Sequence, residues 1–208
     1  MMKQKQNYRL QDRHWQDYNM SKIEKLSLEQ CIACHGGPTL AGIKCGNLFR
    51  FMVSDWEEFN QDYMKMQASI EKKGVSICVL KVQSNWVLLY LYRRKDVCKR
   101  LSEPKIHSFM ANYGYGTDVD KAIALLGEKV RATDAFPHEI GIFLGYPLED
   151  VQGFICNNGR KCSVCGLWKS YGEPQAAKAQ FQKIYHCMEI YRRAILKGCT
   201  LEQLTVAS

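Results

Sequence analysis

Three segments of the chain place apolar residues three or four positions apart, the spacing of a helix that buries one face. These segments are Trp56–Ile70, Val119–Val130 and Ala177–Ile195. Ser54 and Glu57 form a capping-box pattern just before the first segment, which predicts where that helix begins. We therefore expect three amphipathic helices that pack on a common core.

Two neighbouring segments are rich in β-branched and aromatic residues, as strands are. Val75–Lys81 and Trp86–Tyr92 are separated by a short polar turn, which predicts a hairpin. The second run is almost continuously apolar, so we expect a central strand that is buried on both faces. Thr39–Met52 and Gly166–Gly172 are predicted as further strands. The resulting order predicts an α+β protein with a ferredoxin-like split βαβ core of about four strands and additional helices.

The ends of the chain differ in composition. Residues 1–20 are polar and rich in Gln, Asn and Lys, which predicts a flexible N-terminal arm, followed by a short helix over Lys22–Cys34. Residues 21–208 are predicted to form one α+β domain, because 46% apolar residues suffice for a core. No apolar run approaches the roughly 20 residues of a membrane span, and no export signal is visible. A cytoplasmic location without a membrane partner is therefore expected.

Ten cysteines are the first candidates for chemistry. In a reducing compartment they are expected to be buried thiols, metal ligands or reactive groups rather than disulfides. One cluster spells C-x-x-C-H, the haem-attachment pattern, and another has the C-x-x-C spacing of a zinc knuckle beside a further loop cysteine, Cys156. A haem, zinc or iron site would use Cys31, Cys34, His35, Cys162 and Cys165. The alternative is that these are partly buried structural thiols.

His138 and Glu139 form a second candidate, because their side chains are common proton carriers and a glycine-rich apolar stretch follows them. Adjacent residues on a helix point about 100° apart, so the two cannot share one proton directly. The alternative is an ordinary first helical turn, in which Glu139 is favoured by the helix dipole.

The formal charge of +8 is concentrated in the segment Tyr92–Lys105. This segment could bind phosphate or nucleic acid. No aromatic residues alternate with its charges to stack on bases, so a solvated helix face is the favoured interpretation.

Three motifs together resemble a bacterial family known as domain of unknown function 3793, found mostly in anaerobic Firmicutes. They are Gly37–Lys44, Phe136–Pro147 with its continuation to Phe154, and Cys165–Gly172. The resemblance covers about residues 25–206 and implies no activity. The family pattern usually has cysteine where this chain has Gly36, whereas Cys165 before Gly-x-Trp-Lys matches it.

The three motifs converge if the first and last strands are neighbours in the sheet, as a split βαβ unit requires. The leading hypothesis is therefore a small-molecule pocket. In an enzymatic version, Cys165 is a nucleophile or redox thiol and His138 or Glu139 is its base. The remaining pocket residues would be His35, Pro38, Thr39, Lys44, Tyr146, Trp168 and Lys169.

Overall fold

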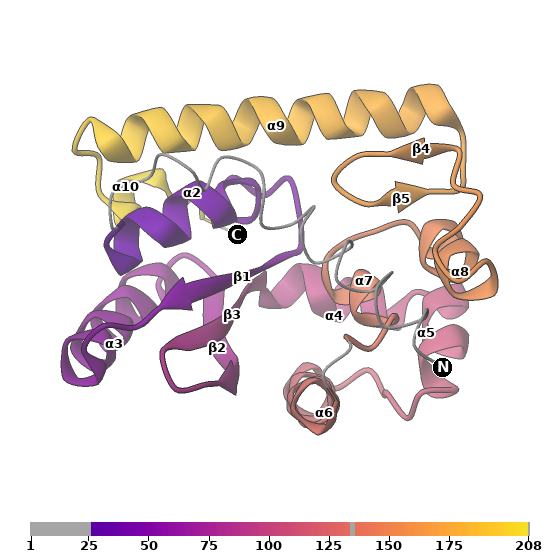
Figure 1. The fold of residues 1–208 in the computed structure, drawn as a ribbon, viewed down its shortest axis with the longest axis horizontal. Coiled ribbons are helices and arrows are strands. Elements are labelled where there is room, and N and C mark those ends of the chain that lie inside the picture. Colours follow the sequence, from indigo (N-terminus) through magenta and orange to yellow (C-terminus); the bar gives the residue numbers. More distant parts are fainter. Residues whose placement is uncertain (1–25, 134–135, 208) are drawn as a thin grey trace.

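A three-stranded antiparallel sheet is the centre of the computed structural model, which describes residues 26–133 and 136–207 (Figure 1). Its strands are β1 (Gly46–Met52), β2 (Val75–Val82) and β3 (Trp86–Arg93), in the order β1-β3-β2. Seven of the eight residues of β3 are buried, and they point alternately to the two faces. The prediction of a central strand buried on both sides is confirmed.

One face of the sheet is covered by α2 (Leu28–Leu40), α3 (Trp56–Glu71), α10 (Leu201–Leu204) and the C-terminal part of α9 (Pro174–Leu196). Val87, Leu89 and Leu91 of β3 face this layer. The α3 stripe is confirmed, but the helix is capped by Asp55, whose carboxylate accepts the amides of residues 57 and 58. Asp55 thus takes the place that the sequence assigned to Ser54.

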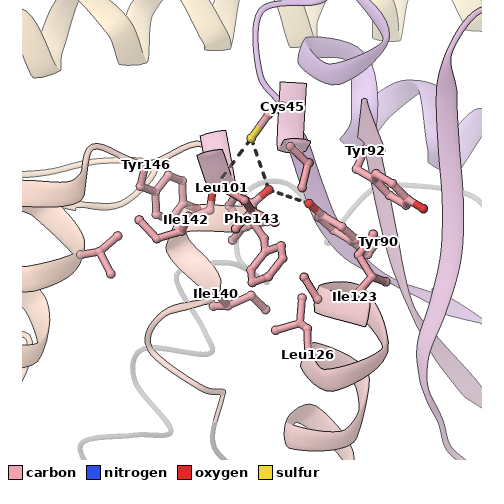
Figure 2. Close-up of a cluster of buried hydrophobic side chains, with 14 of the residues drawn as sticks. Cys45, Tyr90, Tyr92, Leu101, Ile123, Leu126, Ile140, Ile142, Phe143 and Tyr146 are labelled. Atoms are coloured by element: carbon pink, nitrogen blue, oxygen red, sulfur yellow. Dashed lines mark hydrogen bonds between the residues drawn. The ribbon is translucent and has the colours of Figure 1, made fainter. Parts of the chain in front are cut away.

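The opposite face is covered by helices from the middle of the chain. They are α4 (Arg94–Ser102), α5 (Pro104–Ala111), α6 (Val119–Ala132), α7 (Ile140–Phe143) and α8 (Leu148–Cys156). Tyr90 of β3 packs edge-on against Phe143, and Leu126 of α6 lies in the same cluster (Figure 2). None of the helices in the described part of the chain is both long enough and apolar enough to cross a membrane.

A small hairpin lies apart from the sheet. Its strands β4 (Val164–Cys165) and β5 (Lys169–Ser170) pair only with each other. The long helix α9 runs across the molecule and contacts both the hairpin and α2 (Figure 1). The hairpin approaches α9 so closely that a Cβ on Gly166 would lie 2.3 Å from the Phe181 ring.

The α+β class is confirmed, whereas the ferredoxin-like topology is not shown. β1, α3, β2 and β3 have the order of one split βαβ unit. The fourth strand expected from Gly166–Gly172 pairs within its own hairpin instead of beside β1. The predicted arm over residues 1–20 lies outside the described residues, and one domain over residues 21–208 stays a prediction.

The segment predicted as a strand from Thr39 begins instead as helix, since α2 continues through Pro38 to Leu40. The small residues before Pro38 allow close packing. A Cβ on Gly36 would lie 2.3 Å from Leu91, and one on Gly37 would lie 2.8 Å from Tyr191. Burial against β3 and α9 thus overrides the poor helix propensity of this sequence.

Candidate small-molecule site

A cavity of about 310 Å³ opens between the loop after α2, the helix α4 and the turn of the β4–β5 hairpin. Its volume lies at the lower end of the range of ordinary ligand pockets. Its charged lining residues are three cations and two carboxylates, which leaves one excess positive charge. The full lining is Gly42, Ile43, Lys44, Cys45, Asp96, Lys99, Arg100, Glu103, Gly145, Trp168 and Gln180.

The loop at the cavity is shaped by the end of α2. The carbonyl oxygen of Pro38 accepts the amides of Ile43 (2.8 Å) and Lys44 (3.0 Å). Gly42 has φ of 74°, a left-handed conformation that favours glycine. This tight turn puts the Lys44 side chain at the cavity wall.

Lys44 is half-buried, and its Nζ lies 5.3 Å from the centre of the Tyr146 ring. Burial lowers the pKa of Lys44 to about 8. Within residues 26–133 and 136–207, no carboxylate forms an ion pair with this ammonium group. The ring face offers only a weak cation–π attraction, so much of the desolvation cost of the charge is not offset.

One aromatic side chain, Trp168, lines the cavity, and two further rings pack against it. Trp168 stacks on Tyr146 with ring centres 4.6 Å apart, and its other neighbour is the edge-on ring of Phe181 at 4.5 Å. The indole Nε1 of Trp168 donates to Asp150 Oδ2 (2.7 Å). This hydrogen bond fixes the orientation of the ring that lines the cavity.

Asp150 organises the hairpin. Besides the indole of Trp168, its buried carboxylate accepts the Ser170 hydroxyl (3.1 Å) and the amides of Tyr171 (2.6 Å) and Gly172 (3.2 Å). A buried carboxylate with four donors is well satisfied. The two family motifs around residues 136–154 and 165–172 are therefore joined by one side chain, which sequence reasoning did not single out.

The turn after α7 reaches the cavity through Gly145. Cys45 Sγ donates to the carbonyl oxygen of Phe143 (3.4 Å), which also accepts the Tyr90 hydroxyl (2.7 Å; Figure 2). Arg100 donates through Nε to the Ile142 carbonyl (3.1 Å) and through Nη2 to that of Tyr146. Burial raises the pKa of the Cys45 thiol, so it serves here as a neutral donor.

The three predicted catalytic residues lie outside this cavity. Glu139 is buried, and its carboxylate accepts Lys129 Nζ (2.8 Å) and lies 3.5 Å from the Tyr115 hydroxyl. His138 is exposed and packs edge-on against Phe154 at 5.1 Å. Among the described contacts, no hydrogen bond joins Cys165 to either residue. The proposed proton transfer to His138 or Glu139 stays a prediction, although the ion pair gives Glu139 a structural role.

The predicted binding residues divide into two groups. Lys44 and Trp168 line the cavity, and Tyr146 contacts both of them without being part of the lining. His35, Pro38, Thr39 and Lys169 are not part of its lining.

Those four residues have other partners. His35 stacks on Phe49 (5.5 Å), and burial lowers the pKa of this imidazole. Thr39 Oγ1 donates to Asn47 Oδ1 (2.9 Å), and Lys169 Nζ donates to the carbonyl of residue 159 (2.7 Å). Pro38 acts through its carbonyl oxygen.

The cysteines proposed as metal ligands lie in two separate places. Cys31 and Cys34 are in α2, which packs on α9 near Tyr191, whereas Cys162 and Cys165 lie in or beside the hairpin, which packs near Phe181. Ten residues of helix separate those two contact points, about 15 Å. In the described part of the chain, no three His, Cys, Asp or Glu side chains are grouped to hold a metal ion. A combined metal set is therefore not assembled there.

The basic segment Tyr92–Lys105 is partly used within the molecule. Arg93 is buried and donates to the carbonyls of Thr39 (2.6 Å), Leu40 (2.6 Å) and Val206 (2.7 Å). In the same segment, residue 94 pairs with a carboxylate of α6, and residue 100 holds α7. Nucleic-acid binding by this segment stays a prediction.

These features describe a small α+β protein with a cavity lined by charged side chains and by Trp168. The chain belongs to the family described as Protein of unknown function (DUF3793), whose model matches residues 32–205. The resemblance inferred from the motifs is thereby confirmed. No curated protein and no solved structure shows significant similarity to the chain.

Proposed function

We propose that the protein binds a small anionic molecule in the cavity beside Lys44. The observation that carries this proposal is the half-buried ammonium group, which has an aromatic neighbour and no ion-pair partner among residues 26–133 and 136–207. Desolvating a charge is unfavourable unless an opposite charge compensates for it. A ligand carboxylate or phosphate would supply that compensation, and strongly perturbed groups in cavities are typical of functional sites.

The lining suggests the rest of the ligand. The Trp168 side chain suits an apolar or planar portion, while Asp96 of α4 and Glu103, just after that helix, can accept hydrogen bonds from hydroxyl or amino groups. Lys99 adds a second cation from the same helix. We therefore infer a metabolite-sized acid or phosphate ester that also carries hydrogen-bond donors.

The proposed function is binding, without a catalytic step. A cytoplasmic location remains part of the proposal, because all ten cysteines are free thiols, the form that a reducing compartment maintains.

The test measures the binding of sulfate, pyrophosphate and citrate at pH 7 by calorimetry, with wild type and the variants Lys44→Met and Lys72→Met. Lys72 is an exposed lysine after α3 and serves as the matched control. We expect at least one anion to bind, with affinity reduced tenfold or more by Lys44→Met and unchanged by Lys72→Met. The proposal is overturned if wild type binds none of the three at millimolar concentration or if Lys44→Met binds equally well.

The pH dependence gives a second readout. Sulfate keeps its charge between pH 7 and 9, whereas Lys44, with a pKa of about 8, loses its proton over this range. Binding should therefore weaken from pH 7 to pH 9 in wild type, and any residual binding in Lys44→Met should lack this dependence. Equal affinity of wild type at both pH values would contradict the role of the ammonium group.

A further inference from the structure

The β4–β5 hairpin holds a pair of cysteines whose sulfur atoms are nearly in bonding contact. Cys162 Sγ and Cys165 Sγ lie 2.7 Å apart, although neither is disulfide-bonded. A disulfide requires a separation of about 2.05 Å, so closing the bond needs only a small movement. The pair is accessible, because Cys165 is exposed and Cys162 is half-buried.

The backbone around the pair is ordered by local hydrogen bonds. Ser163 donates its amide to the Ser170 carbonyl (2.8 Å), and its hydroxyl contacts the carbonyls of Ser170 and Gly172 (both 3.0 Å). Cys165 itself pairs with Lys169 across the hairpin. Two thiols held in this way meet at a high effective concentration, which favours intramolecular closure over two separate reactions.

The same chain contains a second C-x-x-C pair that lacks these properties. Cys31 and Cys34 lie on α2, where residues three apart have Cβ atoms about 5–6 Å apart, beyond the separation that a disulfide allows. Cys31 is buried with its thiol directed at the Arg50 carbonyl (4.0 Å), and burial raises its pKa to about 12. The two pairs have the same spacing in the sequence, but only Cys162 and Cys165 have sulfur atoms close enough to form a disulfide.

We propose that Cys162 and Cys165 form a redox-active dithiol that undergoes thiol–disulfide exchange with small disulfides. This proposal does not depend on the proposed anion cavity, although the same hairpin carries Trp168 of the cavity lining. The disulfides that do form in reducing compartments are usually transient, as this one would be.

The exchange proceeds in two displacements. The thiolate of the exposed Cys165 attacks one sulfur of a small disulfide, forms a mixed disulfide and releases the first small thiolate. The Cys162 thiolate then attacks the Cys165 sulfur, forms the intramolecular disulfide and releases the second. The protein loses two electrons and two protons, and the small disulfide is reduced to two thiols.

The Cys165 thiol has a pKa raised by partial burial and by Cys162, while Lys169 acts in the opposite direction. Exchange should accordingly become faster as the pH rises from 7 to 9, because more of the thiol is ionised.

The test equilibrates the reduced full chain with a mixture of reduced and oxidised glutathione, alkylates it and digests it with trypsin. Cleavage after Lys161 and Lys169 releases residues 162–169, which contain only these two cysteines. Cleavage after Lys25 and Lys44 releases residues 26–44 with the helical pair. We expect the first peptide to lose two hydrogens, about 2 Da, and to escape alkylation, at least tenfold more often than the second.

Two variants sharpen the result. Cys162→Ser should leave Cys165 as a stable mixed disulfide with glutathione, whereas Cys156→Ser, at an exposed cysteine near the hairpin, should leave the internal disulfide unchanged. The proposal is overturned if both cysteines of residues 162–169 remain alkylatable or carry separate glutathiones. It is also overturned if the helical pair oxidises equally, or if the two thiols are protected at unchanged mass until a chelator is added, which would indicate a bound metal.

Discussion

Replacing Lys44 by methionine should stabilise the protein while removing its proposed ligand site. Methionine keeps an unbranched side chain and removes the ammonium group that lies near the Tyr146 ring. Lowering the Lys44 pKa from its ordinary 10.5 to about 8 corresponds to about 3 kcal/mol, since each pKa unit is worth about 1.4 kcal/mol. Because the side chain is only half-buried, we expect the free energy of unfolding to rise by about 1–3 kcal/mol at pH 7.

The sign of the pH dependence follows from proton binding. Between about pH 8 and pH 10.5, the unfolded chain keeps a proton on Lys44 that the native state has released. Wild-type stability therefore gains from this residue as the pH rises through that window, and the advantage of Lys44→Met shrinks. Below pH 8 the lysine is charged in both states, and the full advantage of the variant is present.

The assay is urea denaturation of wild type, Lys44→Met and the surface control Lys72→Met at pH 7 and pH 10.5. The control should stay within about 0.5 kcal/mol of wild type at both pH values. Adding an anion that binds should stabilise wild type and Lys72→Met more than Lys44→Met, and so reduce the difference between wild type and Lys44→Met. The reasoning is refuted if Lys44→Met is no more stable than wild type at pH 7, or if its advantage is the same at both pH values.

Three further predictions concern buried polar groups and close packing elsewhere in the fold. Asp150→Ala should lower the free energy of unfolding by about 3 kcal/mol or more, because four donors lose their shared buried acceptor. A loss below about 1 kcal/mol in urea denaturation would contradict this. Glu139→Gln should cost about 3 kcal/mol by leaving Lys129 without its counter-charge, and adding Lys129→Met should restore most of it; no recovery in the double variant would argue against a structural ion pair. Gly46→Ala should cost about 1–3 kcal/mol, because its Cβ would lie 2.6 Å from a backbone carbonyl of α7, whereas Gly116→Ala meets open space and should be nearly neutral; equal melting temperatures of the two variants would refute the packing argument.

Parts of the candidate site could be predicted from the sequence. Lys44, Tyr146 and Trp168 were grouped on the basis of their motifs, and the structure brings them together. Arg100 and Asp96 lie in the basic segment for which a solvated helix face was favoured over phosphate binding, because a charged helix face has the same pattern whether it faces solvent or a cavity. Their roles depend on which distant segment packs against α4.

The contacts of the predicted catalytic residues could not be derived from the sequence. A histidine and a glutamate beside an apolar segment are compatible with proton transfer, but Glu139 is paired with Lys129 of α6. The spacing of Glu139 and Lys129 in the sequence does not predict this contact, because the two residues do not lie on one helix and meet only in the tertiary structure.

The sequence by itself determined the local structure whose signals are short-range. Helical periodicity predicted α3, α6 and α9, and continuous apolarity predicted β3 as the central strand. Tertiary structure decided what depends on distant partners. Burial against β3 and α9 extends α2 through Pro38. Asp150 binds the last hairpin, whose strands pair with each other and not with the sheet, so the split βαβ unit gains no fourth strand from it. Hydrophobic period is a property of neighbours along the chain, whereas burial, hydrogen-bond satisfaction and cavity shape arise only when remote segments meet.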